Sequence, residues 1–125
     1  MIVGMGVDIV EVPRVRSAIE RFGERFINRL FTQAEIRYCE SKANKYERFA
    51  ARFAAKEAAL KALGTGLSRG ISWQDVEVVR EPSGRPTLAI RGKAAEFAKR
   101  LGVQRSTVSL SHTEQVAFAQ VILED

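Results

Sequence analysis

The stretch "RFAARFAAKEAALKALGTG" (residues 48–66) decides the fold prediction, because it consists of good helix formers and ends at glycine. We predict a long helix terminated by Gly64 and Gly66, since glycine readily adopts the left-handed conformation at a helix end. At about 100° per residue, the large apolar side chains form one stripe: Phe49, Phe53, Leu60 and Leu63. The opposite side is alanine, which permits another element to approach closely.

Two charged residues stand side by side in the middle of this helix. Lys56 falls within the apolar stripe, and Glu57 borders it, with Lys61 one turn further along. One interpretation is an i,i+4 surface pair of Glu57 and Lys61 worth about 0.2–0.5 kcal/mol, with Lys56 extending past its apolar neighbours to water. Glu57 would more plainly indicate a functional site if a second carboxylate lay close to it in the folded chain.

Asp8 is the candidate for that second carboxylate. Residues 2–10 alternate as a strand does, and Gly4, Gly6 and Asp8 share one face. Aspartate is a poor strand former, and the two glycines leave room beside it for a ligand or another backbone. Asp8 either caps an edge strand, or forms with Glu57 a magnesium–phosphate site with basic residues around it.

The remaining elements predict an α+β domain with a mostly antiparallel sheet, one domain over residues 1–125. Pro13 suits the first turn of a helix through Phe22, and Thr32 with Glu35 fits a capping box that starts a second short helix. The expected later elements are strands 71–80 and 86–92 around a turn at 81–85, a helix over 93–102, and a hairpin of 106–112 and 115–123.

Composition limits the possible chemistry. The chain has one cysteine, Cys39, and one histidine, His112, so neither an internal disulfide nor a Cys/His zinc site is expected. We expect Cys39 to be a buried, idle thiol, and any metal to be a hard, oxygen-bound ion such as magnesium. The net charge of +5 predicts an anionic partner: nucleic acid, a phosphate-rich small molecule or an acidic protein.

The start of the chain opens directly into strand-like sequence, with no basic leader and no small-residue cleavage site. Its longest apolar runs are far shorter than a membrane span. We therefore expect a cytoplasmic protein with no membrane partner.

Three separated motifs carry a resemblance to a known family: "GVDIVEVPRV" (6–15), "RFAAKEAALKALGTG" (52–66) and "VSLSHT" (108–113). In this order, and with the "SGRP" turn (83–86), the whole chain closely resembles the holo-acyl-carrier-protein synthases, the small 4'-phosphopantetheinyl transferases. The resemblance implies the fold of that family, a mostly antiparallel sheet packed with one long helix and shorter helices. It also implies that coenzyme A donates 4'-phosphopantetheine to a serine of apo acyl carrier protein, releasing adenosine 3',5'-bisphosphate, in support of fatty acid biosynthesis.

The resemblance assigns roles to the charged residues already singled out. Asp8 and Glu57 would be the magnesium ligands, and Lys61 would approach the phosphates of coenzyme A. Glu57, or a water that it orients at the metal, is the natural base for the serine proton, and the sequence does not separate these two. Lys56 would provide charge balance or hold the substrate phosphate.

The resemblance also implies a nucleotide region. Arg52 and the "GRP" segment would lie near the adenosine or its 3'-phosphate, while residues 64–66 would run along the nucleotide. The residues expected to contact coenzyme A are therefore Arg52, Lys61, Gly64, Thr65, Gly66, Gly84, Arg85, Pro86 and His112. His112 also has an ordinary structural interpretation, because lone histidines are common in folded domains.

A basic segment follows the first strand. Because acyl carrier proteins are strongly acidic, complementary charge suits this segment to dock one, with a phenylalanine as apolar anchor. The residues expected to take part are Arg14, Arg21, Arg25, Phe26 and Arg29. A solvated basic face with no partner is the alternative.

The final strand is apolar on both faces around residues 116–119, more than one small sheet needs for its own core. Such a strand is usually buried on both sides, and a neighbouring subunit can provide the second cover. The resemblance implies a homotrimer with coenzyme A between neighbouring subunits, so that Asp8 and Glu57 work with residues from another chain.

Two other function classes remain open at this point. A basic nucleic-acid-binding module without catalytic activity is compatible with the net charge, but the chain has no helix-turn-helix, RNP-type or zinc-finger pattern. Salt-sensitive binding to random DNA at physiological salt, with no effect of magnesium on coenzyme A binding, would favour this class. The third possibility is a transferase-like fold that only binds nucleotide.

Overall fold

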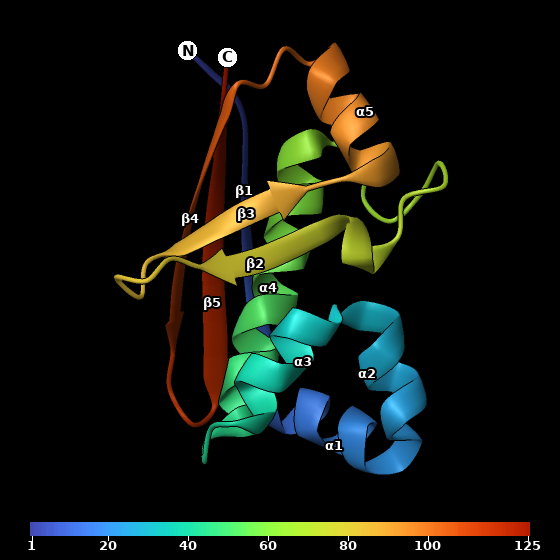
Figure 1. Cartoon of the computed structure of the whole chain (residues 1–125), viewed down its shortest axis with the longest axis vertical. Coiled ribbons are helices and arrows are strands. Elements are labelled where there is room, and N and C mark those ends of the chain that lie inside the picture. Colours follow the sequence, from blue (N-terminus) through green and yellow to red (C-terminus); the bar gives the residue numbers. More distant parts are fainter.

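Helix α4 (Lys45–Leu63) runs through the middle of the molecule and contacts both of its sheets, as the computed structural model of residues 1–125 shows (Figure 1). The other elements are β1 (Ile2–Glu11), α1 (Val12–Phe22), α2 (Glu24–Leu30), α3 (Gln33–Glu40), the 3₁₀ turn η1 (Trp73–Asp75), β2 (Val76–Arg80), β3 (Pro86–Ile90), α5 (Gly92–Arg100), β4 (Arg105–His112) and β5 (Val116–Glu124). The predicted α+β class is confirmed.

The strands form two antiparallel sheets and not one. Three strands lie in the order β1-β5-β4, and β2 pairs with β3 in a separate two-stranded sheet. The β2–β3 pair crosses α4 and reaches β4 through β3 (Figure 1). The chain thus places the long helix between the larger sheet and the smaller one.

Backbone contact between β1 and α4 explains the two glycines of the first strand. A Cβ atom at Gly4 would overlap the carbonyl oxygen of Ala62, and one at Gly6 would overlap that of Ala58. The space beside the glycines was predicted to hold either a ligand or another backbone. In the structure the backbone of α4 fills it. The alanine side of the helix is the side that permits this approach.

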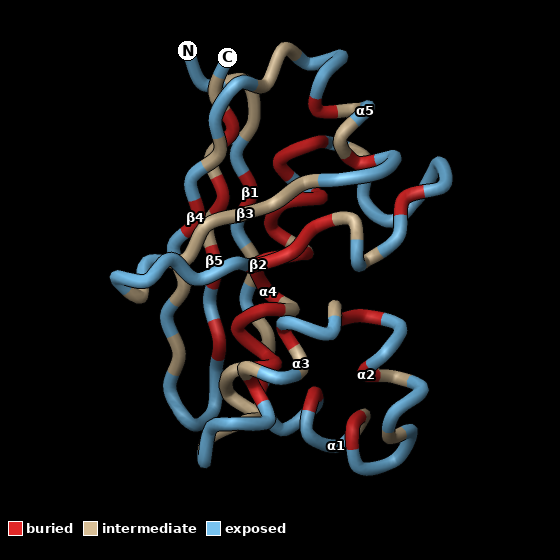
Figure 2. Tube along the Cα trace, in the orientation of Figure 1, coloured by how far each residue is buried: buried red, intermediate tan, exposed pale blue.

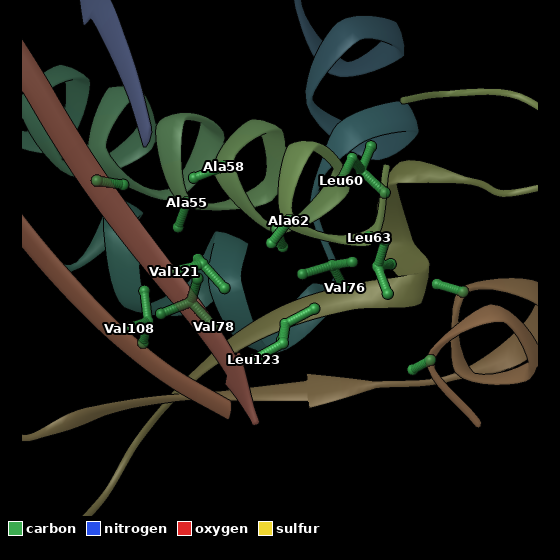
Figure 3. Packing of buried hydrophobic residues seen from close by; sticks show 14 of the residues in the cluster. Ala55, Ala58, Leu60, Ala62, Leu63, Val76, Val78, Val108, Val121 and Leu123 are labelled. Carbon is green, nitrogen blue, oxygen red and sulfur yellow. The ribbon is translucent and has the colours of Figure 1, made fainter. Parts of the chain in front are cut away.

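The core follows the same geometry. Alanines of α4 pack against Val108 of β4 and against Val121 and Leu123 of β5, with Leu60 and Leu63 on the side of β2 (Figure 3). Most of the helix from Phe49 onward is therefore buried, as the red stretches of α4 in Figure 2 show. A second cluster joins the first half of α4 to the three short helices, where the rings of Phe31 and Phe49 lie 4.9 Å apart.

Most predicted element boundaries hold, with three differences. Residues 24–30 form helix α2, which was not predicted, and α4 begins at Lys45, three residues before Arg48. The expected strand over 71–80 begins only at Val76, because residues 72–75 turn back on themselves. The predicted capping box of Thr32 and Glu35 is confirmed at the start of α3.

Lys56 corrects one expectation. Its ammonium group is completely buried and lies 2.8 Å from the carboxylate of Glu35 on α3. It also donates to two carbonyl oxygens, that of Trp73 shortly before β2 and that of Val76, the first residue of β2. Neither a side chain extending to water nor a contact with substrate phosphate fits this position, so Lys56 joins α3, α4 and β2 in the interior.

The outer face of the larger sheet is apolar and uncovered in the single chain. Ala117 and Ala119 point into the core, but Val116 and Phe118 point outward. Across the register, Phe118 pairs with Ile9, and Ile9 leaves 64% of its surface exposed. We predicted that β5 is covered on both faces. Within one chain only its inner face is covered, and its outer face is exposed at Val116 and Phe118.

Two smaller expectations concern composition. Cys39 is fully buried, and burial raises the pKa of its thiol to about 12, as expected of an idle cysteine. None of the helices combines the length and the apolar character that crossing a membrane requires.

Candidate active site

Asp8 of β1 and Glu57 of α4 meet in one groove, which we call the carboxylate groove. Its volume is about 470 Å³, and its lining residues are Asp8, Ile9, Val10, Glu11, Arg14, Val15, Ala18, Phe26, Phe53 and Glu57. The two carboxylates come together because the glycines ahead of Asp8 bring β1 against the helix that carries Glu57. The predicted pair is therefore brought together, although no local pattern links the two positions.

Lys61 points at Asp8 and not at Glu57. Its ammonium group donates to Asp8 Oδ1 at 2.8 Å and to the carbonyl oxygen of Val7 at 3.1 Å. The hydrogen bond and the charge of Asp8 raise the pKa of Lys61. The i,i+4 pair of Glu57 and Lys61 is consequently absent. The positively charged ammonium group of Lys61 lies instead beside Asp8, at the edge of the carboxylate groove.

Glu57 has neither an ion pair nor a side-chain hydrogen bond. Burial raises the pKa of its carboxyl, the neighbouring charge of Asp8 raises it further, and Lys61 partly offsets both. A carboxylate held near a second one and short of counter-charge is a better proton acceptor than a free glutamate. It is also stabilised by any cation that enters the groove.

The donor set fits a hard divalent cation. Lys61 engages one oxygen of Asp8, which leaves the second Asp8 oxygen and both Glu57 oxygens without a protein partner. No group of three or more His, Cys, Asp or Glu residues gathers here or elsewhere in the chain, so the protein does not build a complete metal cage by itself. Magnesium is commonly bound in this way, by one or two carboxylates together with substrate phosphates and water.

A second cavity, the arginine cavity, gathers several of the residues expected to contact the nucleotide. Its volume is about 220 Å³, and its lining residues are Arg48, Ala51, Arg52, Arg80, Gly84, Pro86, Leu110 and His112. They come from the first half of α4, the β2–β3 turn and the end of β4. Four predicted positions (Arg52, Gly84, Pro86 and His112) thus lie together, while Arg85 of the same turn is exposed and does not line the cavity.

Tyr38 of α3 organises the arginines of this cavity. Its ring lies 4.1 Å below the guanidinium carbon of Arg52, and its hydroxyl accepts from Arg48 at 3.2 Å and from Arg80 at 2.7 Å. None of these arginines pairs with a carboxylate, and Arg52 Nε has no partner although Arg52 is only 3% exposed. Burial accordingly lowers the pKa of Arg52. Such a cluster of cations without counter-charge attracts an anion.

Tyr38, Arg48 and Arg80 were missed in the sequence. Arg48 lies one helical turn before Arg52, so the i,i+4 spacing was a usable signal for it. Tyr38 and Arg80 come from other elements, and Arg80 lies 42 residues beyond Tyr38. No local pattern indicates that these two side chains meet.

The predicted residues 64–66 lie away from the arginine cavity. They follow the last turn of α4, where Gly64 adopts φ +79° and Gly66 φ +58°. Arg52 lies 12 residues earlier in the sequence, about 18 Å along the helix axis at about 1.5 Å per residue. A single chain therefore carries two separate clusters of predicted ligand contacts and not one continuous pocket.

The residues predicted to dock a partner lie beside the carboxylate groove. Arg14 and Phe26 line it, and Arg21, Arg25 and Arg29 are exposed on α1 and α2. Arg14 lies 4.0 Å from Glu11, another exposed residue that lines the groove. This basic surface therefore borders the two carboxylates directly.

Comparison with known proteins gives a consistent result. Residues 4–120 match the ACPS model of the 4'-phosphopantetheinyl transferase superfamily. The chain is 64% identical over 125 residues to holo-[acyl-carrier-protein] synthase of Koribacter versatilis, with 100% of both chains covered. It is 54% identical to the synthase of Solibacter usitatus, again with 100% of both covered.

Solved structures agree over the same length. The structure resembles holo-[acyl-carrier-protein] synthase from Neisseria meningitidis with a TM-score of 0.89 and 32% identity, covering 100% of both chains. The synthase from Bacillus anthracis in complex with CoA (3',5'-ADP) gives a TM-score of 0.80 at 35% identity, covering 100% of this chain and 98% of the other. The one from Helicobacter pylori in complex with coenzyme A gives 0.84 at 29% identity, covering 96% and 99%. The chain belongs to the 4'-phosphopantetheinyl transferase superfamily, in the family of the holo-[acyl-carrier-protein] synthases.

Proposed function

We propose that this protein transfers 4'-phosphopantetheine from coenzyme A to a serine of apo acyl carrier protein, giving holo acyl carrier protein and adenosine 3',5'-bisphosphate. The observation that carries the proposal is the meeting of Asp8 and Glu57 in a groove edged by Lys61 and by basic residues. Relatives from Helicobacter pylori and Bacillus anthracis are described in complex with coenzyme A, which supports coenzyme A as the donor. Holo acyl carrier protein in turn supports fatty acid biosynthesis.

Asp8 and Glu57 are the proposed magnesium ligands. The bound ion would neutralise the diphosphate of coenzyme A, which otherwise repels both the nucleophile and the carboxylates. Asp8 keeps one oxygen on Lys61, so its other oxygen would be free to hold the ion. The same arrangement holds the Lys61 ammonium group close to the diphosphate, where it stabilises the negative charge that develops on the leaving phosphate.

Glu57 is the proposed general base. The serine oxygen attacks the β-phosphorus of coenzyme A, and the bond from this phosphorus to the bridging oxygen breaks, so that adenosine 3',5'-bisphosphate leaves. The serine proton passes to the Glu57 carboxylate, directly or through a water that Glu57 orients. Glu57 has no ion pair or side-chain hydrogen bond within the chain, so an oxygen that does not hold the ion would be free to accept this proton.

The arginine cavity is the proposed site for the nucleotide end of coenzyme A. Arg48, Arg52 and Arg80 have no carboxylate partner, and the unpaired Arg52 Nε donor supports an anionic ligand. Residues 64–66 and Lys61 would hold the other part of the same molecule. One chain keeps these two parts separate, so one coenzyme A would bridge two chains.

A homotrimer would bring the two parts together. The exposed apolar face of the larger sheet supports association, because Met5 is 57% exposed beside the outward-facing Ile9 and Phe118. Such a face on a monomer is unusual and typically marks a protein interface. In this arrangement Asp8 and Glu57 of one chain act on coenzyme A that the arginine cavity of a neighbour binds.

The acyl carrier protein would dock on α1 and α2. The exposed arginines there complement its acidic surface, and Phe26, which lines the carboxylate groove, would be the apolar anchor. Docking at this place delivers the serine to the rim of the groove that holds Glu57.

The test is the intact mass of an apo acyl carrier protein after incubation with the protein, coenzyme A and magnesium. A gain of one phosphopantetheine is expected, and none when a chelator replaces magnesium. No gain with several carrier proteins would contradict the proposal.

A further inference from the structure

Glu47 and His112 form a pair that the proposed reaction does not use. Glu47 lies in the first turn of α4 and His112 is the last residue of β4, 65 residues further along the chain. His112 Nδ1 lies 2.9 Å from Glu47 Oε1, and both side chains are largely buried, with 22% and 20% of their surface exposed. The contact therefore holds the imidazole ring in one orientation.

The chemistry of the pair decides which ring nitrogen is available. An ionised carboxylate can only accept hydrogen bonds, so Nδ1 must carry the proton that lies between the two groups. This holds whether the imidazole is neutral or charged. Nε2, which has no partner in the protein, is then the free ring nitrogen of His112, a residue that lines the arginine cavity.

The neighbouring side chains make this nitrogen distinctive. The other polar side chains of the arginine cavity are Arg48, Arg52 and Arg80, and a guanidinium group has no acceptor. A neutral His112 therefore supplies the single side-chain acceptor among the cavity's lining residues. Without Glu47, the ring could exchange its tautomer or turn over, and Nε2 would no longer be held toward the ligand.

We infer that Glu47 is a positioning residue: it fixes the tautomer and orientation of His112 so that Nε2 contacts the nucleotide part of coenzyme A. This inference rests on the proposed function for the identity of the ligand. The contact between Glu47 and His112 itself does not depend on that function. The alternative is a structural clip that joins the start of α4 to the end of β4.

The tautomer can be read directly, because His112 is the only histidine of the chain. Long-range ¹H–¹⁵N spectra of the full protein should show one imidazole with its neutral form protonated at Nδ1. Glu47→Ala should shift this signal toward a mixture of tautomers, whereas Glu47→Gln should keep it, since the amide oxygen still accepts from Nδ1–H. Glu114→Gln removes a carboxylate two residues from His112 that forms neither a hydrogen bond nor an ion pair with it, and should leave the spectrum unchanged.

Kinetics separate positioning from a structural clip. For Glu47→Ala we expect KM for coenzyme A to rise about tenfold with kcat within about twofold, as for loss of one ground-state contact. Glu47→Gln should recover most of this loss, and KM for the carrier protein should not change. Thermal unfolding of each variant shows whether the fold is intact before kinetics are compared.

Several outcomes overturn the inference. The first is an unchanged tautomer in Glu47→Ala, and the second is an unchanged KM for coenzyme A in that variant. The third is a rise in KM in Glu114→Gln or Glu47→Gln that is as large as the rise in Glu47→Ala. If Glu47→Ala does not fold, Glu47→Leu replaces it in both measurements, because leucine fills the site but offers no acceptor to Nδ1–H. Failure of the wild-type protein to modify any carrier protein is a different result: it refutes the proposed function and leaves the spectroscopic test of the pair standing.

Discussion

Replacement of Lys56 by methionine should remove a large part of the folding free energy. Methionine fills a similar volume but leaves Glu35, which is 1% exposed, without its ion-pair partner, and only the more distant charge of Arg52 remains near it. Removing one partner of a buried ion pair typically costs about 3–5 kcal/mol, out of roughly 5–15 kcal/mol for a whole domain. Glu35 keeps two backbone donors, Thr32 N at 2.9 Å and Val78 N at 2.8 Å, which favours the lower end of that range.

Two further variants show whether the loss belongs to the pair. In Lys56→Met/Glu35→Gln the carboxylate charge is gone and the amide oxygen still accepts from Val78 N, so at least about 1 kcal/mol should return relative to the single variant. Lys45→Met is the matched control on the same helix. Its partner Glu40 lies 3.5 Å away at the surface, so its removal should cost less than about 1 kcal/mol.

Urea unfolding followed by fluorescence and far-ultraviolet circular dichroism measures these differences. Trp73 is the only tryptophan, and its carbonyl accepts from Lys56 at 3.2 Å, so its emission reports on the affected region. The protomer concentration must be held constant, because association stabilises the folded state. If Lys56→Met lost less than about 1 kcal/mol but raised KM for coenzyme A, Lys56 would contact substrate and the interior role would be wrong.

Four further predictions concern the proposed site. Asp8→Ala and Glu57→Ala should abolish transfer with the fold intact, and near-normal turnover of either at limiting magnesium would remove that residue from the proposed metal site. The pKa of Glu57 is raised in the folded state. Its contribution to folding stability is therefore complete at acid pH and is lost as the pH rises through the folded-state pKa. Glu57→Gln should therefore unfold like wild type near pH 4 and be more stable near pH 7, by less than about 1 kcal/mol, in chelator; equal curves at both pH values would contradict the shift. Charge reversal of Arg14 and Arg21 should weaken the carrier protein far more than coenzyme A, and equal losses would place docking elsewhere. Asp8→Ala mixed with Arg52→Ala should regain activity if sites are shared, whereas a stable, fully active monomer in light scattering would refute the trimer.

The elements whose signals are local were predictable from the sequence. The capping box of Thr32 and Glu35 and the glycine end of α4 depend on neighbours within a few residues, and both are where they were expected. Helix α2 was missed because its seven residues are too few for a helical repeat of apolar residues to stand out, and they follow Gly23 directly. The strand expected from residue 71 was too long because the side chain of Asp75 turns the chain at Ser72.

The site was predictable where residue type alone carries chemistry. An aspartate in an apolar strand, on the same face as two preceding glycines, and a glutamate beside an apolar stripe were both unusual enough to single out, and they lie in one groove. The partners of Lys56, Lys61 and Tyr38 were not predictable, since each comes from a distant part of the chain. Lys61, for example, binds Asp8 from 53 residues away, although Glu57 is only one turn away.

The contact between β1 and α4 has a consequence for how the two carboxylates keep their separation. Gly4 and Gly6 touch the carbonyl oxygens of Ala62 and Ala58, so the main chains themselves set the gap between strand and helix. Side-chain packing elsewhere can change by a methyl group or two without altering this gap, because no side chain acts as the spacer. Substitutions can therefore accumulate through most of the core while the distance from Asp8 to Glu57 stays the same. The two glycines, which carry no chemistry of their own, are then as restrictive for the reaction as the two acids.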